Sequence, residues 1–389
     1  MLWILLLLLA GAGAKRITGV GPSVLVIQLD GSVFGTGSNA HGQLGVGSPI
    51  VYLPERMVGV TNASAVCLGA FHSCVVDQTV VRCTGTLGGN VLTTATQVFC
   101  GGSTSFALQS ASSLLSSNVL AWGEGTFGKL GLGSYLSQPS PMRLAGIDGA
   151  IRVVDVAAGL SHSCLVTEKG AAYCMGWNYY GQLGNGEGGE LVNKIWPTRV
   201  QASPFEFASM GCGAFHTCAI TTANSGQVLC WGRSNYGQLG LGGSVLVSHL
   251  PQVVQGLRDA HSVWTGVYNS FIVQQNGTVW AFGGNADGVL GDGSTKDKSK
   301  PVQFGLGIKQ VVGGQGSTCV LLALDGVRVQ CLGANSFGQF GVGRGLSSSL
   351  VLVDMQLPGA TNKPTNKPTR KKPTRKKPTK KPTRKKPTK

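Results

Sequence analysis

The sequence predicts an all-β fold in which repeated units pack side by side into a closed ring. Three observations lead to this prediction: 60 glycines among 389 residues, a charged content of only 12%, and a glycine-rich phrase that recurs along the chain. Glycine is favoured where the backbone needs a positive φ angle, so the composition indicates many tight turns. Repeats have to be recognised before a chain of this length is divided into domains.

The recurring phrase is a leading glycine, a few polar residues that often include asparagine, and then Gly-Gln-Leu-Gly. From clear to degenerate, its copies occupy residues 37–45, 176–184, 232–240, 123–131, 283–291, 333–341 and 85–90. The leading glycines are 38 to 56 residues apart, a length that suits four short strands and their turns. The chain therefore holds seven units, and the second is the shortest.

A second phrase, Gly-x-x-His-Ser/Thr-Cys, begins at Gly69, Gly159 and Gly213 and precedes the first phrase in its unit. Apolar residues, a turn and another apolar run follow it, which is the pattern of a β-hairpin. One unit cannot bury both faces of its own sheet, so several must pack together, and a closed ring leaves no exposed ends.

Together, Gly-x-x-His-Ser/Thr and Trp-Gly-x-x-x-x-Gly-Gln-Leu-Gly, as in residues 231–240, resemble the repeat of the regulator of chromosome condensation family. The resemblance covers about residues 17–358 and implies a seven-bladed β-propeller of four-stranded antiparallel blades. It is closer to the secreted, disulfide-containing members than to the nuclear exchange factor. The glycines would then serve turns and close packing between blades.

The two ends of the repeat region predict how the ring closes. Residues 350–357 resemble the outer strand of the other units, and Ile17 to Val20 resemble an inner strand. We expect these N- and C-terminal strands to share one composite blade.

Cysteines occupy two corresponding positions, on either side of a hairpin turn, in four of the seven units, and no unit has only one of the two. Residues that face each other across a hairpin show this pattern, so we predict four disulfide bonds. The pairs are Cys74 with Cys83, Cys164 with Cys174, Cys218 with Cys230, and Cys319 with Cys331.

A zinc site made from these cysteines and His72, His162 or His216 is the alternative, but no fourth ligand recurs, so no metal is expected. The histidines are expected to be core or turn residues. Cys67, Cys100 and Cys212 lie outside the paired positions, and we expect buried free thiols there.

Both ends of the chain differ from the repeats. Residues 1–14 resemble a secretory signal peptide with cleavage after Ala14, the alternative being a buried apolar segment. No other stretch is apolar enough to span a membrane. Residues 15–358 form the predicted propeller, and residues 359–389 form a Lys-Pro-Thr-rich tail that is expected to be disordered. Of the 32 Lys and Arg residues, 14 lie in this tail, so most of the net charge of +16 is there.

The tail is a candidate site for polyanions such as acidic polysaccharide. Its candidate binding residues are Lys371, Lys372, Arg375, Lys376, Lys377, Arg384, Lys385 and Lys386. Asn62 and Asn276 begin Asn-x-Ser/Thr sequons, which are acceptors for N-glycosylation in a secretory protein.

These features predict a secreted, monomeric binding protein that recognises an extracellular protein or glycan with loops on one face. No catalytic residue or cofactor is expected, because no nucleophile, base or metal constellation recurs. The alternative is a nuclear guanine nucleotide exchange factor for a Ran-type GTPase at chromatin, since the tail also resembles a nuclear signal. The Gly-Trp-Arg-His-Thr motifs of plant ultraviolet-B photoreceptors are absent, so a relationship to them is not expected.

Overall fold

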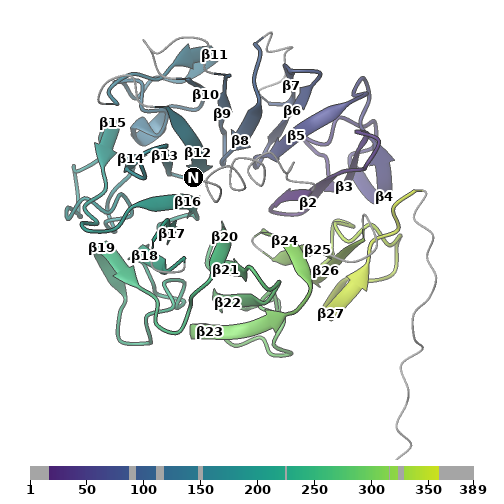
Figure 1. Ribbon diagram of the computed structural model, residues 1–389. Coiled ribbons are helices and arrows are strands. Elements are labelled where there is room, and N and C mark those ends of the chain that lie inside the picture. Colours follow the sequence, from purple (N-terminus) through teal and green to yellow (C-terminus); the bar gives the residue numbers. More distant parts are fainter. Residues whose placement is uncertain are drawn as a thin grey trace, which may run out of the picture. The chain divides into compact units, whose positions relative to one another are not determined.

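Seven antiparallel sheets surround a central axis in the computed structural model (Figure 1). The structure describes residues 17–86, 93–110, 118–147, 152–223, 226–314, 316–322 and 328–358. The propeller belongs to a compact unit that ends at Pro358, and residues 359–389 form a second unit. The described residues contain 27 strands and one short 3-10 helix. None of their helices has the length and apolar character needed to cross a bilayer.

Blades 1 to 3 comprise β1 (Ile17–Val20), β2 (Ser23–Ile27), β3 (Val33–Ser38), β4 (Ile50–Arg56), β5 (Ala63–Leu68), β6 (His72–Asp77), β7 (Val80–Gly85), β8 (Gln97–Cys100), β9 (Thr104–Leu108), β10 (Val119–Gly123), η1 (Thr126–Gly128) and β11 (Gln138–Arg143). Blades 4 and 5 comprise β12 (Val153–Ala158), β13 (His162–Thr167), β14 (Ala172–Gly176), β15 (Lys194–Arg199), β16 (Phe207–Cys212), β17 (His216–Thr221), β18 (Val228–Arg233) and β19 (Val247–Val253). Blades 6 and 7 comprise β20 (Ala260–Thr265), β21 (Asn269–Gln274), β22 (Val279–Gly283), β23 (Lys298–Gly305), β24 (Ile308–Gly313), β25 (Ser317–Leu322), β26 (Val329–Ala334) and β27 (Ser348–Asp354).

Each blade is one contiguous stretch of chain whose strands pair in sequence order. Six sheets have four strands, and blade 2 has three among its described residues. The first strand of each blade lies nearest the axis and the last lies outermost (Figure 1). The seven-bladed, all-β prediction is therefore confirmed.

The core lies between neighbouring blades. Every residue of the second strands β6, β13 and β17 is buried on both sides of the sheet, because a blade covers each face. Every residue of the outermost strand β19 is exposed or half-buried instead. Because both faces of these second strands are covered, they lack the alternation of apolar and polar residues that marks a half-exposed strand, and their polar residues are buried too.

The prediction of a composite blade is wrong. β1 to β4 form blade 1 and β24 to β27 form blade 7, each from its own stretch of chain. The ring closes where β1 packs beside β24. Side chains secure this junction: Gln310 Nε2 donates to the carbonyl of Ile17 at 3.0 Å, and Thr36 Oγ1 donates to the carbonyl of Gly338 at 2.8 Å. Contact between complete sheets is sufficient for closure, so no strand is exchanged.

The leading glycine of the recurring phrase has the same backbone conformation in all seven blades. Its φ angle lies between 88° and 110° in every copy, a region that residues with a Cβ atom rarely adopt. At Gly232, an added Cβ would lie 2.6 Å from the carbonyl oxygen of Phe215. Glycine is therefore required where the third strand passes close to the preceding loop.

Two faces of the ring follow from the antiparallel order of the strands. The connections between first and second strands and between third and fourth strands emerge together, on what we call face A. The connections between second and third strands, and those from one blade to the next, emerge on the opposite side, face B.

Candidate functional site

Four disulfide bonds join opposite residues of the second and third strands, as the sequence predicts. They are Cys74–Cys83, Cys164–Cys174, Cys218–Cys230 and Cys319–Cys331, each with a Cα–Cα distance of 4.1 Å. The two cysteines of every pair are register partners in the sheet.

The expectation that Cys67 and Cys100 are free thiols is wrong. They form a fifth disulfide bond, which joins the innermost strands β5 and β8 of blades 2 and 3. These strands lie side by side because the blades are neighbours in the ring. The fifth bond therefore links blade 2, which has the degenerate phrase, to the next blade. Cys212 is buried and free, and its burial raises the pKa of the thiol.

The three motif histidines bind neighbouring blades together. His162 Nε2 lies 2.8 Å from Thr217 Oγ1, and this hydroxyl donates to the carbonyl of Gln182 at 2.8 Å. Because the hydroxyl proton points to Gln182, Nε2 must carry the proton of the imidazole. Burial lowers the pKa of His162 to about 3, so the ring is neutral at physiological pH.

His72 Nε2 and His216 Nε2 likewise contact the hydroxyls of Ser105 and Ser270, at 2.7 and 2.9 Å. Burial lowers their pKa values to about 4 and about 3. The motif histidines are thus core residues, as expected. Two groups of these side chains have the spacing of metal ligands: Cys67 with Cys74 and Cys100, and His162 with Cys164 and Cys212. All these cysteines except Cys212 are in disulfide bonds, and a disulfide offers no thiolate to a metal.

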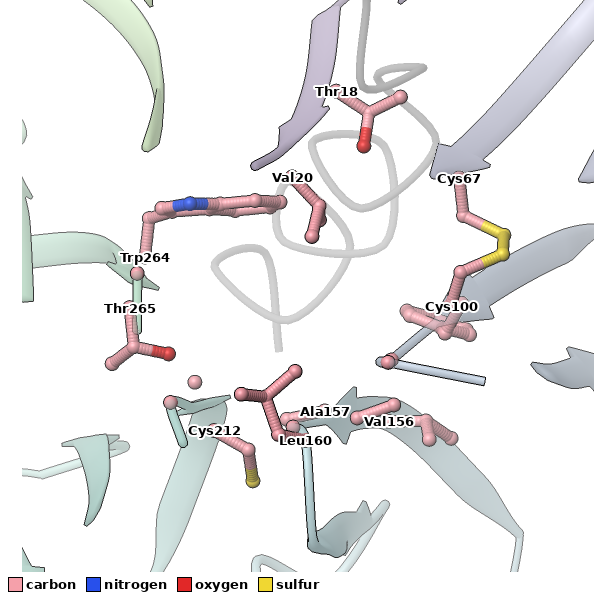
Figure 2. A pocket seen from close by; sticks show the side chains of 18 of the residues that line it. Thr18, Val20, Cys67, Cys100, Val156, Ala157, Leu160, Cys212, Trp264 and Thr265 are labelled. Carbon is pink, nitrogen blue, oxygen red and sulfur yellow. A yellow bond between two sulfur atoms is a disulfide. The ribbon is translucent and has the colours of Figure 1, made fainter. Parts of the chain in front are cut away.

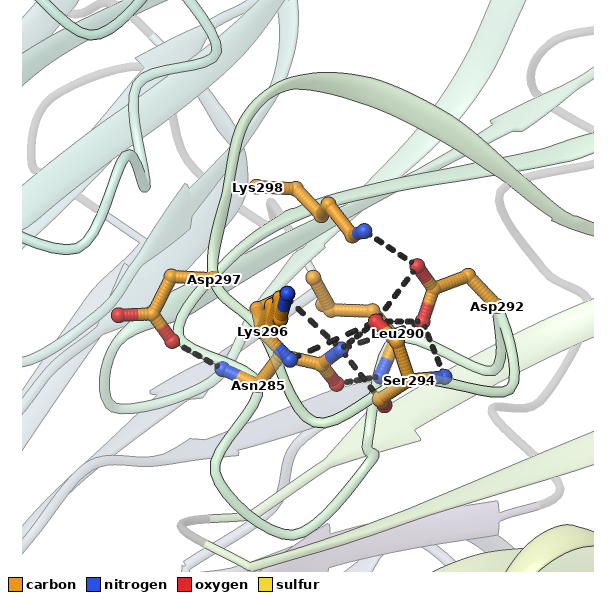
Figure 3. A network of polar contacts seen from close by, with 7 residues as sticks. All are labelled: Asn285, Leu290, Asp292, Ser294, Lys296, Asp297 and Lys298. Carbon is orange, nitrogen blue, oxygen red and sulfur yellow. Dashed lines mark hydrogen bonds and ion pairs between the residues drawn. The ribbon is translucent and has the colours of Figure 1, made fainter.

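The asparagine of the recurring phrase holds the face A loop between the third and fourth strands. In blade 6, Asn285 Oδ1 accepts from the backbone N–H of Leu290 at 2.9 Å, and Nδ2 donates to the carbonyls of Ser294 and Lys296 (Figure 3). Partial burial opposes ionisation of Asp292 in the same loop, but hydrogen bonds from Lys298 and Ser294 outweigh it and lower its pKa to about 2.

The glutamine of the phrase fixes the residue two positions before it. Gln182 Oε1 accepts from the backbone N–H of Tyr180 at 3.0 Å. The same bond forms from His41 to Gln43, from Tyr236 to Gln238 and from Phe337 to Gln339. In these four blades the repeat therefore holds one variable residue at face A, and that residue is His41, Tyr180, Tyr236 or Phe337.

Exposed aromatic side chains in loops lie on face A. Phe71, Phe127, Tyr179, Tyr236 and Phe337 are each between 40% and 44% exposed, and all belong to connections of that face. Aromatic residues of this kind are enriched in protein interfaces, where they provide large contact areas. This surface was not predicted from the sequence; its signal was an aromatic residue directly before Gly-Gln, as at Tyr236 and Phe337.

Trp177 lies at the centre of the densest part of this surface. Its ring stacks on Phe127 and Tyr179 at centroid distances of 5.5 and 6.0 Å, and it makes edge contacts with Tyr180 and Phe215 at 5.7 and 5.2 Å. These rings belong to blades 3, 4 and 5. We call them the Trp177 cluster.

The residue that follows each leading glycine also varies around face A. From blade 1 to blade 7 it is Ser38, Thr86, Glu124, Trp177, Arg233, Gly284 and Ala334. The large side chains thus gather in blades 3 to 5, beside the Trp177 cluster. The backbone repeats in all seven blades, but the large face A side chains are concentrated in blades 3 to 5.

A cavity of about 110 Å³ lies between the innermost strands; we call it the axial cavity. Thr18, Trp264 and Thr265 line it together with the Cys67–Cys100 bond (Figure 2). None of the described residues that line it is charged. Its wall offers mainly van der Waals contact, whereas face A offers aromatic rings and a cation.

The two sequons lie on face B. Asn62, between β4 and β5, and Asn276, between β21 and β22, are both exposed. Pro358 also lies there, since its carbonyl accepts from Gln28 Nε2 at 2.9 Å in the connection between β2 and β3. Residues 1–14 and all the candidate polyanion-binding residues from Lys371 to Lys386 lie outside the described residues.

The repeats of this chain match a known repeat family. The regulator of chromosome condensation (RCC1) repeat matches residues 30–76, 116–166, 169–220, 225–273 and 276–321. The ultraviolet-B receptor UVR8 of Arabidopsis thaliana is 30% identical over 275 residues, which are 69% of this chain and 60% of that protein. The human E3 ubiquitin-protein ligase HERC2 is 27% identical over 342 residues, which are 86% of this chain and 6% of HERC2.

The chain therefore spans less than two thirds of the length of either relative. The expectation of no relationship to the ultraviolet-B photoreceptors is wrong, since the repeats themselves are similar. Among solved structures, yeast RCC1 (Prp20), determined with Kap60, aligns with a TM-score of 0.71 and 16% identity over 89% of each chain. This similarity shows a shared fold.

Proposed function

Because the chain belongs to the regulator of chromosome condensation (RCC1) repeat family, we propose that it is a secreted, non-enzymatic binding protein whose face A contacts a protein partner. The Trp177 cluster is the observation that carries this proposal. It combines rings from three blades in one partly exposed surface, which is the composition of an interface hot spot.

The disulfide bonds support the secretory part of the proposal. Five of them lie within the described residues, and such bonds persist in oxidising compartments and are rare in the cytosol and nucleus. Residues 1–14 supply the apolar leader that secretion requires. The exchange-factor alternative needs a reducing, nuclear environment instead.

We further propose that the tail anchors the protein to a polyanionic surface. The charges from Lys371 to Lys386 provide the attraction, which salt weakens.

Two measurements test secretion and anchoring. Mass spectrometry of the native protein should find Lys15 at the N-terminus and all five disulfide bonds in a non-reducing peptide map. An intact Met1 with reduced cysteines would favour the exchange factor. On immobilised heparin, the full chain should elute at higher salt than a chain that ends at Pro358, and equal elution would exclude the anchor.

Site-specific photo-crosslinking tests face A. A photoreactive phenylalanine analogue replaces Tyr179 on face A in one variant and Leu306 on face B in another. Both side chains are exposed, at 42% and 67%. In the extracellular medium of the cells that produce the protein, the Tyr179 variant should form a discrete adduct that the Leu306 variant does not. Adducts through Leu306 alone would contradict the proposal.

A further inference from the structure

Arg233, the last residue of β18, carries its guanidinium group over the Trp177 cluster. Its Cζ atom lies 5.0 Å from the centroid of the Tyr180 ring and 5.7 Å from that of Phe215, distances that fit cation–π contacts. The Nε atom of Arg233 is buried and has no hydrogen-bond partner in the described chain, and no carboxylate there pairs with the guanidinium. The stacking orients the cation without neutralising it.

Two acidic residues in the face A loops of blades 3 and 4 have partners of their own. Glu124 Oε2 accepts from Lys129 Nζ at 2.8 Å, and the same ammonium group donates to the carbonyl of Leu160 at 3.1 Å. Glu187 pairs with Lys194 at 2.7 Å. These carboxylates are therefore engaged, and the charge of Arg233 remains available to a ligand.

We propose that Arg233 binds a carboxylate of the partner while an adjacent apolar side chain of the partner contacts Trp177. This inference rests on the proposed binding role of face A. A guanidinium group binds a carboxylate through two parallel N–H···O bonds, and stacking on aromatic rings fixes its plane. The preferred ligand is a peptide segment in which an acidic group lies beside a large apolar residue. The acid is either an Asp or Glu side chain or the C-terminal carboxylate.

The experiment selects peptides that bind the disulfide-bonded protein from two random libraries. In one library the peptide is flanked on both sides by carrier sequence, and in the other its C-terminus is free. The best peptide is then synthesised in three forms: acidic, with the acid replaced by its amide, and with an amidated C-terminus. Dissociation constants are measured by fluorescence anisotropy for the wild type, Arg233→Gln and Trp177→Ala. Arg258→Gln, which removes an exposed arginine on face B, is the matched control, and thermal melting checks that every variant is folded.

Acidic peptides should be enriched, and Arg233→Gln should weaken them about tenfold or more, as should the amide form on the wild type. The amide form of the peptide should bind Arg233→Gln only slightly more weakly than either change alone predicts for the wild type, because both changes remove the same contact between the guanidinium group and the carboxylate. Amidation of the C-terminus distinguishes the two sources of the carboxylate. Arg258→Gln should have no effect, and added salt should reduce the affinity.

Other results overturn the inference. If Trp177→Ala abolishes binding but Arg233→Gln does not change it, face A binds without recognising an acid. If neither variant affects the selected peptides, the proposed function of face A fails as well. Failure to select any peptide also counts against the inference.

Discussion

Asn269 occupies in blade 6 the place that His216 occupies in blade 5. The carbonyl of each accepts from a glycine N–H at 2.9 Å, Gly266 for Asn269 and Gly213 for His216. The side chain of each also lies directly against that glycine. Asparagine is therefore an accepted substitute at this buried site, and it does not titrate.

Acid should destabilise the propeller through its buried histidines. Their folded pKa values are about 4 for His72 and about 3 for His162 and His216, against about 6.5 in the unfolded chain. As the pH falls below 6.5, the unfolded chain binds protons that the folded chain does not. The free energy of unfolding should therefore fall, by about 2 kcal/mol per histidine at pH 5. Urea unfolding at pH 8, 6 and 5 measures this loss.

His162→Asn should make stability less dependent on pH. The variant keeps a side chain that the fold already uses at this position but removes the titrating group, so less stability should be lost between pH 8 and 5. His249→Asn, at an exposed position, is the control. An unchanged pH dependence in His162→Asn would show that burial of this histidine does not govern acid sensitivity.

Gly232→Ala should destabilise the protein by about 3 kcal/mol, because a Cβ atom there combines a strained φ angle with a clash against Phe215. Gly47→Ala is the matched control, since nothing lies within 4 Å of the added Cβ and the φ angle is ordinary. The control should change stability by less than about 0.5 kcal/mol. Equal midpoints of thermal unfolding for the two variants would contradict this explanation of the repeated glycine.

Removal of the Cys67–Cys100 bond should loosen blade 2 locally. The bond closes a loop with a sequence separation of 33 residues, for which chain entropy gives about 3 to 4 kcal/mol. In the double variant Cys67→Ala, Cys100→Ala, hydrogen exchange should increase most in β5 and β8. Cys212→Ala should retain all five bonds and native exchange rates. Uniform exchange in the double variant would mean that the bond does not support this junction.

Glycans should attach at Asn62 and Asn276 when the protein passes through a eukaryotic secretory pathway, because both side chains are exposed in connections of face B. Peptide mapping before and after enzymatic deglycosylation should locate them, and Asn62→Gln and Asn276→Gln should each lose one. Since both sites are opposite the Trp177 cluster, peptide binding should not change. Unmodified sequons in secreted material would exclude this modification.

The sequence predicted those features that each blade repeats. The four hairpin disulfide bonds depend on register partners within one unit, so spacing alone reveals them. The Cys67–Cys100 bond joins inner strands of two units, and its proximity arises only when the ring forms. A repeat period alone does not show which strand begins a blade, and for this reason the prediction of a composite blade was wrong.

The aromatic site was missed for a related reason. The phrase predicted the role of its glycines within each unit, but the ring of Tyr180 contacts Phe215 and Arg233, which belong to the neighbouring blade. A single repeat contains only part of this group. The cluster becomes visible when the face A loops of blades 3, 4 and 5 are placed side by side.

Closure without strand exchange bears on how such a ring can change in evolution. Each blade begins and ends within one uninterrupted segment, and the junction between β1 and β24 involves the same kind of sheet contact as the others. Duplication or deletion of a single genetic segment can thus add or remove a whole blade without separating a strand from its partners. By the same reasoning, if the original ends of the propeller are joined by a linker and new ends are introduced between any two blades, the circularly permuted protein should still form the closed ring.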